Sequence, residues 1–190
     1  IKEIASEMKN GATPSRGNPE YWNSNDVPWL KTGEIDSNVL IEAEEFISLS
    51  GFENSSTKLI PEDSVLVAMY GATAAQVAYL KFEATTNQAC CAMTFASTKD
   101  STYVYYYFSV NQSEIENMAI GGAQPNLSKT LIEELDILLP NKAVLNAHPF
   151  VDIMDYREKL TRSIARLKAT SSILLSLISK EESHKTEQVA

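Results

Sequence analysis

The sequence predicts an α+β domain with a mixed or antiparallel-rich sheet and short helices, followed by one long coiled-coil helix. Its 190 residues suffice for one ordinary domain and an appended element. Several short runs before residue 100 are rich in β-branched residues and bounded by turn formers, as strands are. Near the end of the chain, apolar side chains recur at alternating steps of three and four, the pattern of a coiled coil. We therefore divide the chain into a globular domain (1–140), a linker (141–149), a long helix (150–180) and a polar tail (181–190).

The first hundred residues are predicted to form mainly strands joined by turns. Residues 1–8 are the exception, because Ile4 and Met8 have helical spacing and Gly11 is suited to end a helix. A strand is expected at 27–30, and a short helix or turn at 48–56. Three further strands are predicted at 64–70, 76–82 and 88–95, the first being the most strongly β-branched.

The next forty residues or so are predicted to be mainly helical. The aromatic-rich segment 102–111 fits either a helix or a strand by periodicity, and we favour a helix. Short helices are expected at 113–120 and 127–134, and a last strand at 135–139. Pro149 suits the first turn of the long helix, and the polar tail is expected to fray.

The long helix carries one continuous apolar seam. Arg157 and Ser171 occupy two of its positions, and Arg157 is expected to pack its stem against a partner. A helix of this length runs roughly 45 Å, too far to bury its seam against a small domain. It therefore requires a second helix, from another copy of this chain or from another protein. The six apolar seam positions are Ile153, Leu160, Ile164, Leu167, Leu174 and Ile178.

The charge is unevenly distributed. The whole chain carries a net charge of −9, with eight basic and nineteen acidic residues in 1–140 and eight basic and six acidic residues in 141–190. A DNA-binding surface would therefore have to be a confined patch.

Neither a membrane-spanning run nor a signal peptide is recognisable in the sequence. The adjacent Cys90 and Cys91 are interpreted as buried core thiols. We expect a cytoplasmic protein without a disulfide framework or metal site.

Catalytic chemistry is not expected in the globular domain. Both histidines, His148 and His184, lie outside it, which removes the imidazole that nucleophile–histidine systems and most zinc sites use. Neither a phosphate-binding P-loop nor a dinucleotide-binding glycine motif occurs. The carboxylates of Glu42, Glu44 and Glu45 are interpreted as a solvated face rather than as general acids or bases.

Polar side chains on glycine-punctuated loops remain as candidates for binding. Arg, Lys, Gln and Asn can contact base edges, while Ser and Thr can position phosphates. The same residue types also occur in turns for purely structural reasons. Both interpretations stay open for these loops.

Seven short motifs in this chain resemble, in order, the target recognition domain of type I restriction-modification specificity (S) subunits. The similarity covers about residues 1–180. Each motif is weak alone, but their ordered combination is fairly specific. The motifs are GATPSR (11–16), YW (21–22), VPWL (27–30), LIP (59–61), VLVAMYGA (65–72), TNQA (86–89) and LDILLP (135–140).

The resemblance implies a role without catalysis. An S subunit normally carries two recognition domains, each reading one half of an interrupted DNA sequence, and two helices packed antiparallel. It recruits methyltransferase (M) subunits, which use S-adenosylmethionine, and restriction (R) subunits, which use ATP, so no cofactor is expected in this chain. The resemblance therefore leaves two alternatives, because only one domain and one helix occur here. The chain is either a half-length subunit, which pairs with a second copy of itself or with a second S half, or a fragment of a longer subunit. The linker sequence NKAVLNAHP and the strong acidity depart from the family pattern.

With that resemblance, seven residues are predicted to contact double-stranded DNA. Arg16 and Lys31 are the strongest candidates, being two of only eight cations in the acidic domain, although either can equally be a solvated surface charge. Tyr70 is alternatively the last core residue of its strand, and Trp22 and Trp29 are expected to pack in the core or against loops. The predicted contacts are Ser15, Arg16, Lys31, Tyr70, Thr73, Gln124 and Asn126.

Two other functions fit parts of the pattern. A coiled-coil adaptor with a protein-binding head would suit the acidity. A recognition domain from a single-chain restriction-methyltransferase would require an Asn/Asp-Pro-Pro-Tyr motif upstream, and this chain lacks that motif.

Overall fold

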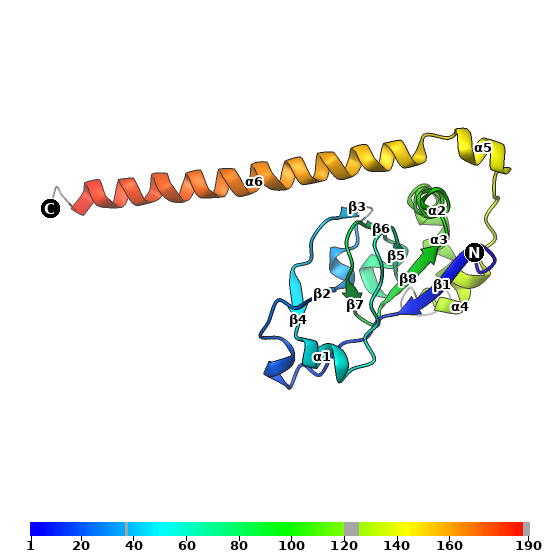
Figure 1. The fold of residues 1–190 in the computed structure, drawn as a ribbon, viewed down its shortest axis with the longest axis horizontal. Helices are drawn as coiled ribbons and strands as arrows, with labels where there is room; N and C mark the ends of the chain where they lie inside the picture. The colour runs from blue at the N-terminus through cyan, green and yellow to red at the C-terminus, as the bar shows by residue number, and fades with distance from the viewer. Residues whose placement is uncertain (37, 120–125, 188–190) are drawn as a thin grey trace.

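The computed structural model describes residues 1–36, 38–119 and 126–187, and it describes side chains up to residue 179 except that of residue 119. A globular domain is followed by helix α6 (Phe150–Glu187). Figure 1 shows α6 passing α2 and β3 along one side of the domain and then continuing well beyond it. The α+β domain followed by a long helix confirms the predicted fold class.

A five-stranded mixed sheet forms the centre of the domain. Its order is β1-β8-β5-β6-β3, and all neighbours are antiparallel except β3 and β6. Alternate residues of the central strands enter two separate apolar clusters, so that Val65 and Leu66 face opposite sides. Both faces of the sheet are therefore buried. The strands are β1 (Ala5–Asn10), β3 (Asn38–Leu40), β5 (Val65–Ala68), β6 (Val77–Leu80) and β8 (Cys90–Phe95).

A smaller sheet, in the order β4-β2-β7, adjoins the first. It comprises β2 (Val27–Leu30), β4 (Glu45–Ile47) and β7 (Thr85–Thr86). The helix α1 (Leu49–Glu53), capped by the Ser48 side chain, follows β4 and fulfils the prediction of a short helix.

Short helices after β8 cover one face of the large sheet. They are α2 (Thr98–Val110), α3 (Gln112–Ala119) and α4 (Lys129–Glu134). Val104, Tyr105 and Phe108 of α2 are buried in the same cluster as Val65 and Met93 of the sheet. Cys90 and Cys91 are buried free thiols, and burial raises the pKa of Cys91 to about 12. Within the described residues, no helix has both the length and the apolar character that crossing a membrane requires.

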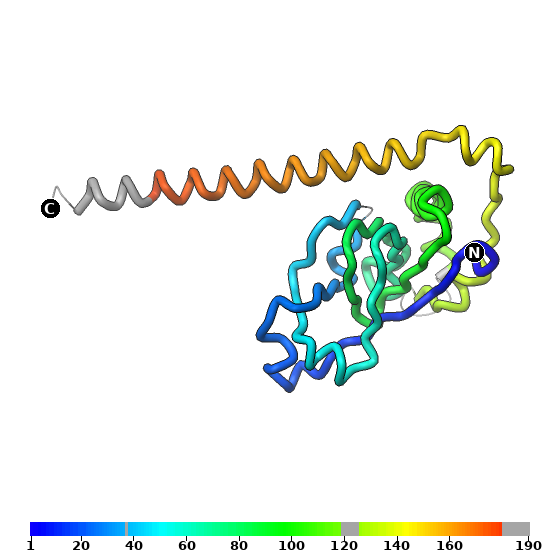
Figure 2. Tube along the Cα trace, in the orientation of Figure 1, coloured from blue at the N-terminus to red at the C-terminus, as the bar shows by residue number. Residues whose placement is uncertain are grey.

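The predicted helix at residues 1–8 is wrong. Residues from Ala5 onward form β1, which runs beside β8 (Figure 2). A spacing of four residues fits two periods of a strand as well as one turn of helix, so the spacing of Ile4 and Met8 does not distinguish the two structures. Gly11 consequently does not end a helix.

The predicted strand at 135–139 is also wrong. This segment has no regular secondary structure, and some of its carbonyl groups accept hydrogen bonds from tyrosine hydroxyls instead of from a neighbouring strand. The Tyr107 hydroxyl donates to the Asp136 carbonyl at 3.3 Å, and Tyr103 donates to the Leu138 carbonyl. Leu138 is 90% exposed. An additional short helix, α5 (Lys142–Ala147), lies in the segment predicted as a linker.

The first turns of α6 pack against the globular domain. Met154 is only 1% exposed, and the ring of Phe150 stacks on that of Tyr106 with 5.4 Å between centroids. The Arg157 guanidinium lies 5.4 Å from the centre of the Tyr105 ring. Arg157 was expected to reach outward, but it contacts its own domain instead. Packing of its stem against a partner stays a prediction. The helix continues into the predicted polar tail as far as Glu187.

A largely buried lysine joins α6 to the sheet. Lys81 follows β6, and its Nζ lies 2.8 Å from an oxygen of Asp63 and 3.2 Å from an oxygen of Glu158 on α6. Burial disfavours the charged form of Lys81, but hydrogen bonds to Asp63 and Glu158 outweigh it and raise its pKa. Burial likewise disfavours ionised Glu158, yet hydrogen bonds from Arg162 and Lys81 lower its pKa.

Lys81→Ala should lower the free energy of unfolding by about 1–2 kcal/mol, because two carboxylates in a partly buried site lose their shared cation. Urea denaturation followed by circular dichroism measures the change. Lys58→Ala, at an exposed position, is the control and should change stability by less than about 0.5 kcal/mol. Equal effects of the two substitutions would contradict a role for Lys81 in attaching α6.

Candidate nucleic-acid interface

The loop that follows β1 is held by close backbone contacts. A Cβ added to Gly11 would lie 2.1 Å from the Thr86 carbonyl oxygen, so only glycine permits this approach. The next residue, Ala12, donates its N–H to the same Thr86 oxygen at 2.9 Å. Its carbonyl accepts hydrogen bonds from the Trp29 indole at 3.0 Å and the Thr57 hydroxyl at 3.2 Å. The loop therefore has a fixed position relative to β2 and β7.

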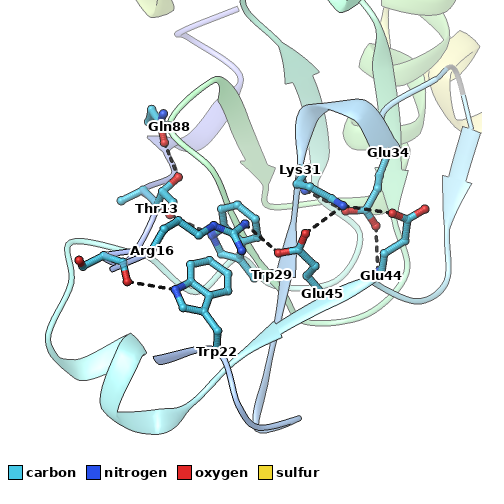
Figure 3. A network of polar contacts seen from close by, with 11 residues as sticks. Thr13, Arg16, Trp22, Trp29, Lys31, Glu34, Glu44, Glu45 and Gln88 are labelled. Carbon is cyan, nitrogen blue, oxygen red and sulfur yellow. Dashed lines mark hydrogen bonds and ion pairs between the residues drawn. The ribbon is translucent and has the colours of Figure 1, made fainter. Parts of the chain in front are cut away.

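Arg16 lies on this loop, between an indole ring and a carboxylate (Figure 3). Its Cζ is 3.5 Å from the centre of the Trp22 ring, and its Nη2 is 2.7 Å from Glu45 Oε2. Trp22 is itself fixed, because its Nε1 donates to the Ser15 carbonyl at 3.1 Å and its ring meets the Trp29 ring edge to face at 5.0 Å. Trp22 and Trp29 thus pack against a loop, as expected, but they also carry a candidate DNA-binding side chain.

Lys31 joins the same cluster from the end of β2. Its Nζ lies 3.0 Å from Glu45 and 3.2 Å from Glu44 (Figure 3). Hydrogen bonds to Glu45 and Glu44 raise the pKa of Lys31. Burial disfavours ionisation of Glu45, but hydrogen bonds from Arg16 and Lys31 outweigh it and lower the pKa of this carboxyl.

The acidic run at 42–45 therefore does more than form a solvated face. Glu44 and Glu45 form ion pairs with Arg16 and Lys31, the two cations predicted from the sequence to contact DNA. No sequence pattern predicts this pairing, because β4 is three residues long and Arg16 and Glu45 lie 29 positions apart.

Three other predicted residues gather after β5. Tyr70 forms an isolated bridge with Asn126, and the Thr73 hydroxyl donates to the Tyr70 carbonyl at 3.4 Å. Tyr70 is 41% exposed, so it is not the last core residue of its strand. Asn126 is exposed as well. The remaining candidate, Gln124, lies outside the described residues.

The turn at residues 86–89 connects the two groups of candidates. On one side, the Thr13 hydroxyl donates to Gln88 Oε1 at 2.5 Å. On the other, the Met69 N–H donates to the Ala89 carbonyl at 2.8 Å. The loop that carries Ser15 and Arg16 and the loop that carries Tyr70 and Thr73 therefore border one turn. Such a surface offers guanidinium, ammonium, hydroxyl and amide groups, which suit base edges and phosphates.

Acid should destabilise this cluster through Glu45. A carboxyl whose pKa is lowered by folding contributes stability that is complete above its ordinary value of 4.5 and is lost as the pH falls through the folded-state value. Between about pH 5 and pH 3, the wild type should therefore lose more stability than Glu45→Gln. Urea denaturation followed by the fluorescence of the two tryptophans measures this, and parallel pH profiles would contradict it.

Comparison with known proteins places this geometry in context. Residues 1–170 match the family described as "Type I restriction modification DNA specificity domain". The EcoR124I/EcoR124II specificity subunit of Escherichia coli is 27% identical over 159 residues, which are 81% of this chain and 39% of that protein. The EcoprrI specificity subunit of Escherichia coli is 30% identical over 104 residues, or 53% of this chain and 26% of that protein.

The fold also has a counterpart among solved structures. The S subunit of a type I restriction-modification system from M. genitalium superposes with a TM-score of 0.60 at 14% identity, covering 86% of this chain and 39% of that one. The chain therefore spans well under half the length of these relatives.

Proposed function

Because this chain belongs to the family of type I restriction-modification DNA specificity domains, we propose that it is all or part of a DNA sequence-specificity subunit. In this role it reads one half of an interrupted target in double-stranded DNA and has no catalytic activity of its own. It recruits methyltransferase subunits, which use S-adenosylmethionine, and restriction subunits, which use ATP. The family match over residues 1–170 carries the proposal, because it spans both the candidate DNA-binding loops and the start of the long helix.

The loops support the DNA-reading part of the proposal. Arg16 and Lys31 are partly exposed and held in place by ion pairs. The loop that carries Tyr70 and Thr73 borders the turn at residues 86–89, and Asn126 pairs with Tyr70. A rigid scaffold that presents polar side chains on ordered loops is the usual arrangement for specific binding.

The exposed seam of α6 supports pairing with a second copy. All six apolar seam residues are at least 42% exposed, so the single chain leaves a long apolar stripe open to water. One antiparallel register brings the apolar seam residues of two copies opposite one another. In that register Ile164 faces Leu167 of the other copy and Ile153 faces its Ile178, because the seam is symmetric about its midpoint.

Selection from a randomised duplex library tests the function. The chain is assembled with a methyltransferase subunit, bound DNA is recovered at several salt concentrations, and the recovered sequences are compared. We expect an enriched motif that survives increasing salt, since non-specific phosphate binding weakens with salt. An assembled complex that enriches nothing would contradict the proposal and favour the protein-binding adaptor.

A further inference from the structure

The Arg16 guanidinium has a fixed plane and a fixed rotation within that plane. Stacking on Trp22, with Cζ 3.5 Å from the ring centre, sets the plane. The 2.7 Å ion pair between Nη2 and Glu45 sets the rotation. The Arg16 Cζ also lies 4.8 Å from the centre of the Trp29 ring, and this contact limits the movement of the guanidinium further. Half of the Arg16 side chain nevertheless stays accessible, at 50% exposure.

We propose that Arg16 reads a guanine in the target and that Glu45 is the positioning residue that orients it. This inference rests on the proposed function. A guanidinium has five N–H donors, of which Glu45 occupies one nitrogen, so donors remain for a ligand. Guanine presents two acceptors, O6 and N7, side by side in the major groove, and this pair matches the fork of an arginine.

The charges around Arg16 favour a base over a phosphate as its ligand. The carboxylates of Glu34, Glu44 and Glu45 outnumber the two cations, Arg16 and Lys31, so the cluster has no net positive charge to attract the DNA backbone. The directional hydrogen bonds of an oriented fork do not depend on net charge. Ordering the side chain before binding also removes an entropic cost that a free arginine would pay on contact with DNA.

The two glutamates differ in a way that provides a matched control. Glu45 contacts both Arg16 and Lys31, whereas the only cation that Glu44 contacts in the described part of the chain is Lys31. Glu45→Gln and Glu44→Gln each remove one negative charge from the cluster. Only the first disturbs the orientation of Arg16.

The experiment measures binding constants for the motif selected by the wild-type chain assembled with a methyltransferase subunit. Each base pair of the half-site is replaced in turn, and all variants are compared on the same duplexes. Arg16→Ala and Arg16→Lys should each lose discrimination of about 5- to 150-fold at one G·C pair and keep it elsewhere. Glu45→Gln should lose part of the same discrimination, and Glu44→Gln none.

Two results would overturn the inference. In the first, Arg16→Lys retains full discrimination between base pairs. In the second, Arg16→Ala weakens binding to all duplexes equally and reduces the salt dependence of binding by the amount that about one phosphate contact contributes. The first result would show that the base is not read by an oriented guanidinium, and the second would make Arg16 a phosphate ligand. A wild-type complex without sequence preference would instead refute the proposed function itself. Circular dichroism and thermal unfolding confirm that each variant is folded before its binding is interpreted.

Discussion

Leu167→Asp should abolish pairing through α6 and leave the globular domain folded. Leu167 is 70% exposed in the single chain and lies next to the centre of the proposed helix pair. A carboxylate there must be buried among apolar side chains, and symmetry introduces two of them. We expect association to weaken by about 100-fold or more. The domain is unaffected because α6 contacts it through its first turns, around Met154.

Arg166→Asp is the matched control, since it introduces the same residue one position away, on a face outside the seam. Light scattering after size exclusion gives the molar mass of each variant. A paired mass for Leu167→Asp at the concentrations where the wild type pairs would refute the seam assignment.

Gly11→Ala should destabilise the domain by about 1–3 kcal/mol and eliminate specific DNA binding. The added Cβ would lie 2.1 Å from the Thr86 oxygen and 2.4 Å from the Asn87 oxygen. Both are backbone atoms, and Thr86 is fixed by its pairing with Leu30 in β2. The loop that carries Arg16 must therefore move away from the smaller sheet.

Gly33→Ala provides the comparison, because none of the residues that the structure describes, other than its chain neighbours, lies within 4 Å of an added Cβ at that position. Its free energy of unfolding should stay within about 0.5 kcal/mol of the wild type in urea denaturation. If Gly11→Ala proves as stable as Gly33→Ala, the close approach of the loop to Thr86 is not required.

The parts of the fold that the sequence predicted are those with a long or unambiguous pattern. The long helix has nearly four heptads, and the strands β5, β6 and β8 are continuous β-branched or apolar runs between turn residues. The strands β3, β4 and β7 have three residues or fewer, which is too short to show a period. They exist because neighbouring strands supply their hydrogen bonds.

The errors have the same origin. A spacing of four residues fits a helix and a strand equally, so the pairing of β1 with β8 decided the structure of the first segment. The apolar segment at 135–139 has strand composition but pairs with none of the described strands, and tyrosine hydroxyls satisfy two of its carbonyls instead. In both places tertiary contacts override the local preference.

The candidate site was only partly predictable. Arg16 and Lys31 stood out because cations are scarce in the acidic domain, and their role in DNA contact stays a prediction. Their common partner Glu45 was not predicted to contact them, because ion pairs across distant segments require the fold. The stacking of Arg16 on Trp22 was missed for the same reason.

Mapping DNA methylation tests the central claim most directly. The chain is co-expressed with its candidate methyltransferase subunit in a host that lacks adenine methylation, and modified adenines are located across the genome. Two identical copies that pair through α6 and read one half-site each should methylate an interrupted, palindromic motif. An assembled complex that leaves the genome unmodified would contradict the account, and an asymmetric motif would refute pairing between identical copies.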